Sequence, residues 1–382
     1  MRVLELSMRP IQILCLLVLF PFVTPEAAVG AEASYLTFLV PGSLGTFPMS
    51  MNSSMTVTGY YTTSPSTASA FIRDATGTIT TFSIRGGLWT EPESINDSGD
   101  ITGFYEVVAG VQESFVRYAN GRIVTFNPSV KSCFDYPPES LPVAINNFGE
   151  IAGNYSGFCV ASTGFTRSRA GGFDNNVIKN YAGSNYPVGI LGLNTNGAVV
   201  GYGANGSVYI DAGGLLVHPD GYVVGIEVPV SGPISDEATI PEAINDDGVV
   251  AGWYSYDCHN STCTAATGGF VRSPQGDYTV FNPRGKLVAP VLATFFDGKT
   301  LYSAPKSLSL NASGVIAGTY TDATGTRHGF VRNPYGTITP FDPPRGMQTT
   351  ATCINDSGVI AGTFYYDWNT QTSIGFLRIP AQ

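Results

Sequence analysis

The chain has 382 residues, of which only 13% are charged, and its formal net charge is −10. With 19 basic against 29 acidic residues it lacks the clustered Lys and Arg that phosphate neutralisation requires, which excludes a nucleic-acid partner. Abundant Gly (45) and Pro (25), together with 12% aromatic residues, favour many short strands and tight turns over long amphipathic helices. We therefore expect an all-β protein.

The first 31 residues differ from the rest of the chain. Arg2 and Arg9 accompany a short apolar stretch, Ile11–Val23, and small residues follow as far as Ala31. This pattern predicts a secretory signal peptide at 1–31 and a single mature domain at 32–382. A retained membrane anchor is the alternative, although the apolar stretch is short for one. We expect a secreted, extracellular or periplasmic monomer with no membrane span in the mature chain, in a compartment where disulfides persist.

A short phrase of hydrophobic residue, Asn, turn and Gly recurs through the mature chain. Its copies align on Asn52, Asn96, Asn146, Asn194, Asn245, Asn311 and Asn355. The intervals between these residues are 44, 50, 48, 51, 66 and 44 residues. Repeats of about 40–50 residues are typical of propeller blades or solenoid coils.

The second copy shows how many strands each repeat holds. It predicts strands at Ser94–Asn96, Asp100–Tyr105, Ser114–Arg117 and Arg122–Asn127, joined by Asn/Asp-Gly turns that close tight hairpins. In the fourth copy, Ser207–Asp211 and Leu215–His218 compete as the third strand. Four strands per repeat favour propeller blades.

The two ends of the chain indicate how such a ring would close. The last copy stops after its third strand, whereas Tyr35–Val40 resembles a fourth strand without the first three. Pro340, within another fourth strand, marks these strands as sheet edges. We therefore predict a seven-bladed β-propeller whose N-terminal strand completes the last blade. A β-solenoid or two sandwiches are the alternatives.

Two further positions of the repeat predict structural roles. A Gly recurs mid-way along each second strand, and we expect a bulky group of a neighbouring sheet, the third-strand Phe, to approach it. An Arg follows that Phe by two positions, and we expect it to join blades by bonding turn carbonyls or Asp side chains. These residues include Gly103, Gly153, Gly252, Gly318, Gly362, Arg117, Arg272 and Arg332.

Propeller topology divides the connections between two faces. The turn face carries the first-to-second and third-to-fourth turns, which are short and uniform; the loop face carries the long second-to-third and blade-to-blade connections. Variable loops on a rigid scaffold are the usual place for binding, so we predict a binding surface on the loop face. Its candidate residues are aromatic, although any single ring is more often a residue that packs a loop: Trp89, Tyr136, Tyr186, Phe295, Phe296, Tyr366 and Trp368.

The cysteines predict disulfides on the same face rather than a metal site. Cys258 and Cys263 share one loop, Cys133 and Cys159 fall on the same side, and Cys353 remains as a buried thiol. Zinc is disfavoured because no second Cys or His pair accompanies them. Calcium is disfavoured because the Asp residues of the turns are inconsistent between copies and fit Asx turns better. We expect no metal and no cofactor.

No sequence motif indicates catalysis. The three His residues occupy unrelated repeat positions, and no Gly-x-Ser-x-Gly, HExxH or phosphate loop is present. Acid pairs on the loop face could still support a glycosidase or polysaccharide lyase, with Asp135, Glu139, Asp236 and Glu237 as examples.

The repeated pattern also carries a family resemblance. The alternation of [IL]-N-x-x-G-x-[IV]-x-G with [GAS]-F-[VIL]-R resembles the bacterial probable-extracellular-repeat (HAF-type) proteins over nearly the whole mature chain. The resemblance implies secretion and repeat architecture, and it carries no substrate or active-site residues. We expect a non-enzymatic secreted protein that binds a glycan or protein partner. A carbohydrate-active enzyme and a structural cell-surface component are the alternatives.

Overall fold

The computed structural model describes most of the chain beyond the predicted signal peptide, which itself lies outside the described residues. The described residues are 32–108, 111–128, 139–157, 160–175, 177, 188–204, 212–229, 238–255, 258–259, 262–263, 268–288, 306–366 and 372–381. All regular secondary structure within these ranges is β-strand, which confirms the all-β prediction. The described part of the chain contains no helix of the length and apolarity that a membrane crossing requires.

Each copy of the repeat folds into a small antiparallel sheet. The strands of the first three copies are β2 (Gly45–Met51), β3 (Val57–Ser64), β4 (Thr67–Arg73), β5 (Ile79–Phe82), β6 (Trp89–Ile95), β7 (Ile101–Val108), β8 (Val111–Arg117), β9 (Ile123–Phe126), β10 (Glu139–Ile145), β11 (Ile151–Gly157), β12 (Val160–Arg167) and β13 (Phe173–Asp174). Those of the fourth and fifth copies are β14 (Val188–Leu193), β15 (Val199–Ala204), β16 (Ala212–Val217), β17 (Val223–Ile226), β18 (Ala238–Ile244), β19 (Val250–Ser255), β22 (Gly268–Arg272) and β23 (Tyr278–Phe281), with β20 (Cys258–His259) and β21 (Thr262–Cys263) forming a separate ribbon. The remaining strands are β24 (Lys286–Leu287), β25 (Leu308–Leu310), β26 (Ile316–Thr321), β27 (Arg327–Arg332), β28 (Ile338–Phe341), β29 (Met347–Ile354), β30 (Ile360–Tyr365), β31 (Ser373–Ile379) and β1 (Ser34–Phe38).

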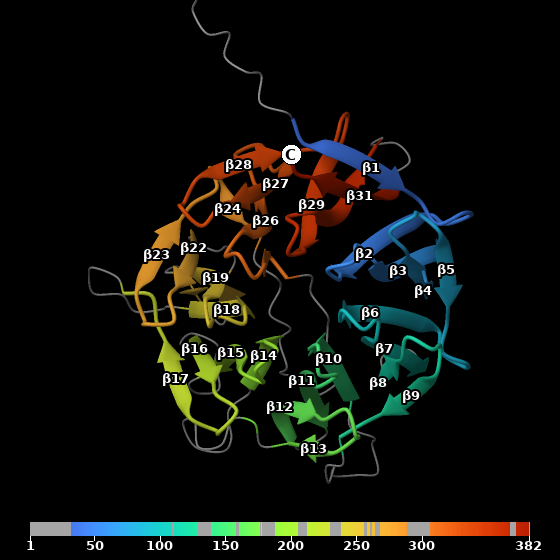
Figure 1. The fold of residues 1–382 in the computed structure, drawn as a ribbon, viewed down its shortest axis with the longest axis horizontal. Helices are drawn as coiled ribbons and strands as arrows, with labels where there is room; N and C mark the ends of the chain where they lie inside the picture. The colour runs from blue at the N-terminus through green and yellow to red at the C-terminus, as the bar shows by residue number, and fades with distance from the viewer. Residues whose placement is uncertain are drawn as a thin grey trace, which may run out of the picture.

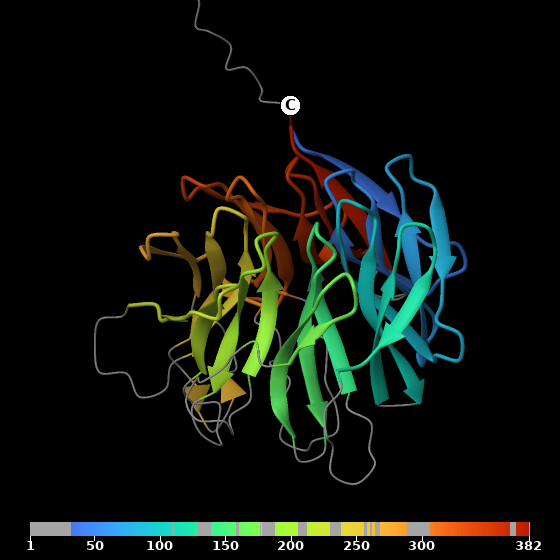
Figure 2. The ribbon, with the colours of Figure 1, turned by 60° about the horizontal axis from the view of Figure 1, so that its bottom comes forward.

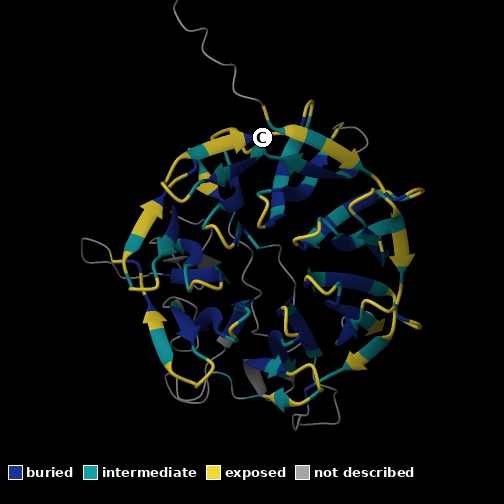
Figure 3. Ribbon diagram, in the orientation of Figure 1, coloured by how far each residue is buried: buried dark blue, intermediate teal, exposed yellow. Residues whose placement is uncertain are grey.

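The sheets are arranged around a common axis, with the first strand of each innermost and the fourth outermost (Figure 1). The outer strands are the most exposed (Figure 3), and Pro340 lies in one of them, β28, where only one neighbour needs ladder hydrogen bonds. Because successive strands alternate in direction, the hairpin turns of the turn face and the connections of the loop face lie at opposite ends of the sheets (Figure 2).

The hydrophobic core lies between neighbouring sheets. The third-strand Phe residues are fully buried there: Phe71, Phe115, Phe165, Phe270, Phe330 and Phe376. One core cluster joins Val57 and Phe71 of the first copy to Cys353 and Leu377 of the last. Cys353 is a free, buried thiol, as predicted, and burial raises its pKa to about 12.

The two ends of the described chain lie side by side. β1 pairs antiparallel with β31, from Ser34 opposite Ile379 to Phe38 opposite Gly375. A parallel bridge between Gly45 and Ser373 joins β2 to β31 in the same way that bridges join β4 to β6 and β16 to β18. The terminal strand β1 therefore pairs with β31 in the way that the fourth strand of another copy pairs with its third strand.

The recurring Gly is required by a feature that the sequence analysis did not identify. The first strand bulges by one residue opposite it, as between Pro241 and Ala243 in β18. A Cβ on Gly252 would lie 2.1 Å from the Ile240 carbonyl oxygen, closer than the ring of Phe270 at 2.8 Å. The predicted approach from a neighbouring sheet is therefore wrong, because the bulge and the Phe both belong to the same sheet as the Gly.

The recurring Arg bonds a turn carbonyl, one of the two predicted partners, but it does so within its own copy and joins neighbouring sheets by stacking on an aromatic ring. Arg332 donates from Nη1 to the carbonyl oxygen of Asn333 in its own hairpin at 3.2 Å, rather than to an Asp. Its guanidinium lies 5.1 Å from the ring centroid of Phe281 at the end of the preceding copy's fourth strand. The same stacking pairs Arg117 with Phe82, Arg167 with Phe126, Arg378 with Phe341, and Arg73 with Phe38 of β1.

Two irregular copies are resolved by the strand assignments. In the fourth copy the third strand is β16, so the Leu215–His218 alternative is correct in position. The 66-residue interval arises because β24 and β25 both pair with β26. The stretch 284–307 therefore includes the short strand β24, and its residues 289–305 lie outside the described residues.

Candidate functional site

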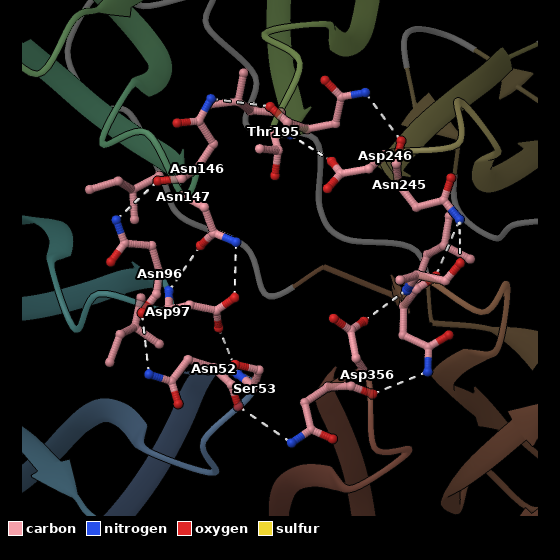
Figure 4. A pocket seen from close by; sticks show the side chains of 18 of the residues that line it. Asn52, Ser53, Asn96, Asp97, Asn146, Asn147, Thr195, Asn245, Asp246 and Asp356 are labelled. Carbon is pink, nitrogen blue, oxygen red and sulfur yellow. Dashed lines mark hydrogen bonds between the residues drawn. The ribbon is translucent and has the colours of Figure 1, made fainter.

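The turn face is held together by the seven repeat asparagines, which we call the ring asparagines (Figure 4). Within each turn the Asn side chain accepts a backbone N–H, as from Asp100 to Asn96 Oδ1 at 2.9 Å, and the turn closes on a positive-φ Gly, Gly99. Each Nδ2 group donates to the backbone carbonyl of the next ring asparagine at 3.0–3.3 Å. The last of these bonds runs from Asn355 back to Asn52, so the chain of hydrogen bonds returns to its start.

The residues that follow the ring asparagines form further bonds between turns. Asp97 accepts the Ser53 N–H at 2.9 Å, Asp246 accepts the Thr195 N–H at 2.7 Å, and Asp356 accepts the Ala312 N–H at 2.9 Å. The prediction that these carboxylates cap their own turns is therefore wrong. The ring asparagines cap the turns, and the aspartates cap the turns of the preceding copies.

These turns surround a pocket on the axis, with a volume of about 210 Å³. Its lining consists of a rim, made of the ring asparagines and the residues that follow them, and of the apolar residues that precede them. These apolar residues are Met51, Ile95, Ile145, Leu193, Ile244, Leu310 and Ile354, and all seven also contribute to the core clusters between sheets. No Lys or Arg lines the pocket, whereas three aspartates do.

Two of the seven predicted loop-face aromatics lie in the described residues. Trp89 is half-buried at the start of β6 and donates from Nε1 to Glu91 Oε2 at 2.8 Å. Tyr366 is 52% exposed, and its hydroxyl accepts a hydrogen bond from Arg345 at 3.3 Å. The other five predicted residues lie outside the described residues: Tyr136, Tyr186, Phe295, Phe296 and Trp368.

Trp89 belongs to a row of three aromatic rings from the first two copies. Phe47 stacks on Tyr60 with centroids 4.7 Å apart, and Tyr60 lies 5.6 Å from Trp89. Burial, and then the charges of Glu91 and Glu93, raise the pKa of the Tyr60 phenol. The row therefore places aromatic surface next to carboxylates at the inner strands.

Charged groups of several copies meet near the axis. Burial raises the pKa of the Glu91 carboxyl, and the charge of Glu93 adds to this rise. Burial lowers the pKa of Lys306, while Glu93 of β6 and Glu242 of β18 oppose that fall. A carboxyl group of raised pKa, that of Glu242, which interacts with an amine of lowered pKa, that of Lys306, is a combination typical of functional sites.

Glu242 anchors the chain where it re-enters the sixth sheet. Its carboxylate accepts bonds from Ser307 Oγ at 2.6 Å, the Leu308 N–H at 3.0 Å and Trp253 Nε1 at 3.1 Å. The side chain is fully buried, and this desolvation raises its pKa to about 7 against the effect of the three donors.

A second charged group lies at the loop-face end of the sixth sheet. His328 Nδ1 lies 2.7 Å from Asp342 Oδ2, and Nε2 lies 3.4 Å from Asp322 Oδ2. Partial burial opposes protonation, but the two carboxylates outweigh it and raise the pKa of His328. Within the described ranges no three His, Cys, Asp or Glu side chains converge as metal ligands.

The acids of this cluster were missed by sequence reasoning, although a signal existed. Glu93 and Glu242 both occupy the bulge position, where other copies have residues such as Val143. A carboxylate at a position that holds Met49, Val143 and Leu191 in three other copies would have singled them out. Of the acids named as examples from the sequence, Glu139 begins β10, while Asp135, Asp236 and Glu237 lie outside the described residues.

The predicted disulfides are only partly within the described residues. Cys258 and Cys263 face each other in the ribbon of β20 and β21. Directly opposed residues of an antiparallel pair have a Cα separation that suits a disulfide, so this pairing remains a prediction with compatible geometry. Cys133 and Cys159 lie outside the described residues.

Comparison with known proteins identifies the type of fold but not the activity. No protein-family model matches the chain, and no curated protein matches it. A crystal structure of puromycin hydrolase matches 87% of this chain and 53% of its own, with a TM-score of 0.57 and 13% identity. A prolyl endopeptidase structure matches 88% of this chain and 46% of its own, with a TM-score of 0.50 and 10% identity. The chain thus spans about half the length of these structures, and the likeness defines a propeller-like all-β protein.

Proposed function

We propose that the protein is a secreted seven-bladed β-propeller, closed by β1 as the fourth strand of the last blade. The pairing of β1 with β31, the bond from Asn355 to Asn52 and the stacking of Arg73 on Phe38 support closure. The predicted signal peptide supports export, and the repeat pattern supports membership of the extracellular-repeat family that it resembles.

We further propose that the propeller is non-enzymatic and binds a glycan through its loop face. The observation that carries this proposal is the exposure of large apolar side chains at the loop-face ends of neighbouring blades. These residues are Leu39, Leu44, Leu88, Val107, Val108 and Tyr366, each 39–56% exposed. Exposed apolar side chains gathered in one region mark interaction sites. The row of Phe47, Tyr60 and Trp89 beside Glu91 adds the aromatic and carboxylate groups that suit a sugar.

A glycan array with the secreted domain tests this proposal, read for both retention and cleavage. Two exposed tyrosines provide a matched pair of variants: Tyr366→Ala on the loop face and Tyr335→Ala on the turn face, where Tyr335 is 95% exposed. We expect Tyr366→Ala to weaken retention about tenfold, as loss of a contact worth about 1.4 kcal/mol would, and Tyr335→Ala to leave it unchanged. An array without retention would refute glycan binding and favour a protein partner or a structural role.

A carbohydrate-active enzyme is the second candidate function, and the charged cluster favours it. Glu91 and Glu242 carry raised pKa values, and Lys306 carries a lowered one, so a general acid and a general base could coexist near neutral pH. Cleavage products on the array that disappear with Glu91→Gln would establish this function and refute the non-enzymatic proposal.

A further inference from the structure

The turn-face pocket has an incomplete rim. In four turns the N–H after the ring asparagine is bonded to a side chain of the next turn, as from Asp97 to Asn147 Oδ1 at 3.0 Å. In the other three turns the corresponding N–H has no such partner among the described residues, because the next turn offers Thr195, Ala312 or Ser53 at that place. The three N–H groups belong to Asn147, Asp246 and Asp356.

The same rim carries acceptors next to these donors. Asp246 and Asp356 each use Oδ1 for the bond between turns, and Oδ2 makes no hydrogen bond within the described chain. Each of these residues therefore offers one backbone donor and one carboxylate acceptor to a ligand in the pocket. A hydroxyl group donates and accepts at once, so it complements such a rim.

Other ligand classes fit the pocket less well. An anion would meet three aspartates with no basic residue in the lining. A metal ion needs several converging acceptors, and no metal-ligating group of three forms among the described side chains. Leu193 and Leu310, both half-buried, also line the pocket, and Phe148, directly after the lining residue Asn147, is 71% exposed. Polar rim groups with apolar and aromatic surface are what a sugar ring requires.

We propose that this pocket binds one neutral saccharide unit, at a site separate from the loop face. Its volume of about 210 Å³ corresponds to about seven water molecules, at roughly 30 Å³ each, and suits a single sugar unit rather than an extended chain. The hydroxyls of the sugar contact the carboxylates and N–H groups of Asp246 and Asp356. The C–H face of the sugar packs on Leu193 and Leu310.

The test uses neutral methyl pyranosides as probes, with backbone amide shifts measured by NMR on the mature protein. We expect the amide signals of Asn147, Asp246 and Asp356 to shift on titration. Asp246→Asn retains a side-chain oxygen for the Thr195 N–H but replaces the carboxylate acceptor, and should weaken binding about tenfold. The matched control, Asp247→Asn, removes the same charge from the same turn outside the pocket lining and should leave binding unchanged.

A second variant separates binding from folding. Ala312→Asn supplies an acceptor for the Asp246 N–H, as Asn147 does for Asp97, so it should raise the unfolding temperature and still weaken the glycoside. Absence of shifts at the three turn amides with every pyranoside would overturn the proposal. Equal loss with Asp247→Asn, or binding of methylammonium in place of the pyranosides, would also overturn it. Because Tyr366→Ala should not affect these shifts, failure here is distinguishable from failure of the loop-face proposal.

Discussion

A close backbone approach that recurs in the repeat predicts a large penalty for one added methyl group. Gly252 lies opposite the bulge in β18, and a Cβ at this position would lie 2.1 Å from the Ile240 carbonyl oxygen and 2.7 Å from Pro241 Cα. Real Cβ contacts begin at 3.0 Å, so the strands would have to separate by about 0.9 Å. Both neighbours are backbone atoms, which cannot move without undoing the bulge. We expect Gly252→Ala to lower the free energy of unfolding by about 3 kcal/mol, at the upper end of overpacking costs.

The matched control reverses the sign of the effect. Gly225 lies in the outer strand β17, where a Cβ would meet no other atom within 4 Å, and its φ is not positive. Ala is ordinarily favoured over Gly inside a strand by about 0.5–1 kcal/mol, so Gly225→Ala should be neutral or stabilising. Guanidinium unfolding followed by circular dichroism compares the two variants. If Gly252→Ala unfolds at the same denaturant concentration as Gly225→Ala, the bulge does not account for the recurring Gly.

Three further predictions concern single contacts. Arg332→Ala should destabilise the protein by about 2 kcal/mol, because it removes a desolvated cation–π contact with Phe281, and should leave loop-face affinity unchanged; lost affinity at full stability would contradict this role. The raised pKa of His328 means that its stabilising contribution is complete below pH of about 6.5 and is lost as the pH rises through the folded-state pKa. His328→Gln should therefore make the unfolding temperature less dependent on pH above pH 6.5. An unchanged pH dependence would refute the stabilising role of the protonated His328. Peptide mapping without reductant should recover Cys258 linked to Cys263, and free thiols at both positions in the secreted protein would exclude the disulfide.

The repeat pattern was sufficient to predict the strands, because their causes are local. Asn and Gly at fixed spacing close the turns, as at Asn96 and Gly99, and alternation of side chains marks the buried strands. The buried third-strand Phe and the exposed fourth strands also follow from this pattern. The bulge opposite Gly252 could not be predicted, because it depends on how two strands pair rather than on either strand alone.

The candidate sites were less predictable, because they combine residues that are far apart in the chain. The charges of Glu93 and Glu242, which belong to different sheets, affect the pKa of Lys306. No local sequence spacing indicates that these three residues interact. The turn-face pocket is formed by short, uniform turns, none of which carries a binding motif of its own. The missing side-chain partner of the Asp246 N–H becomes evident only when Ala312 is known to follow Asp246 around the ring.

The central claim of the account is that β1 closes the ring by pairing with β31. Leu36 lies directly opposite Leu377, so a double variant, Leu36→Cys with Leu377→Cys, should form a disulfide during export. The control pairs Leu36→Cys with Val280→Cys, on the outer strand of another sheet, and should remain unlinked. Mass spectrometry of non-reduced peptides measures both linkages. A link between positions 36 and 377 is the predicted result, and a folded monomer without it would contradict closure by the N-terminal strand.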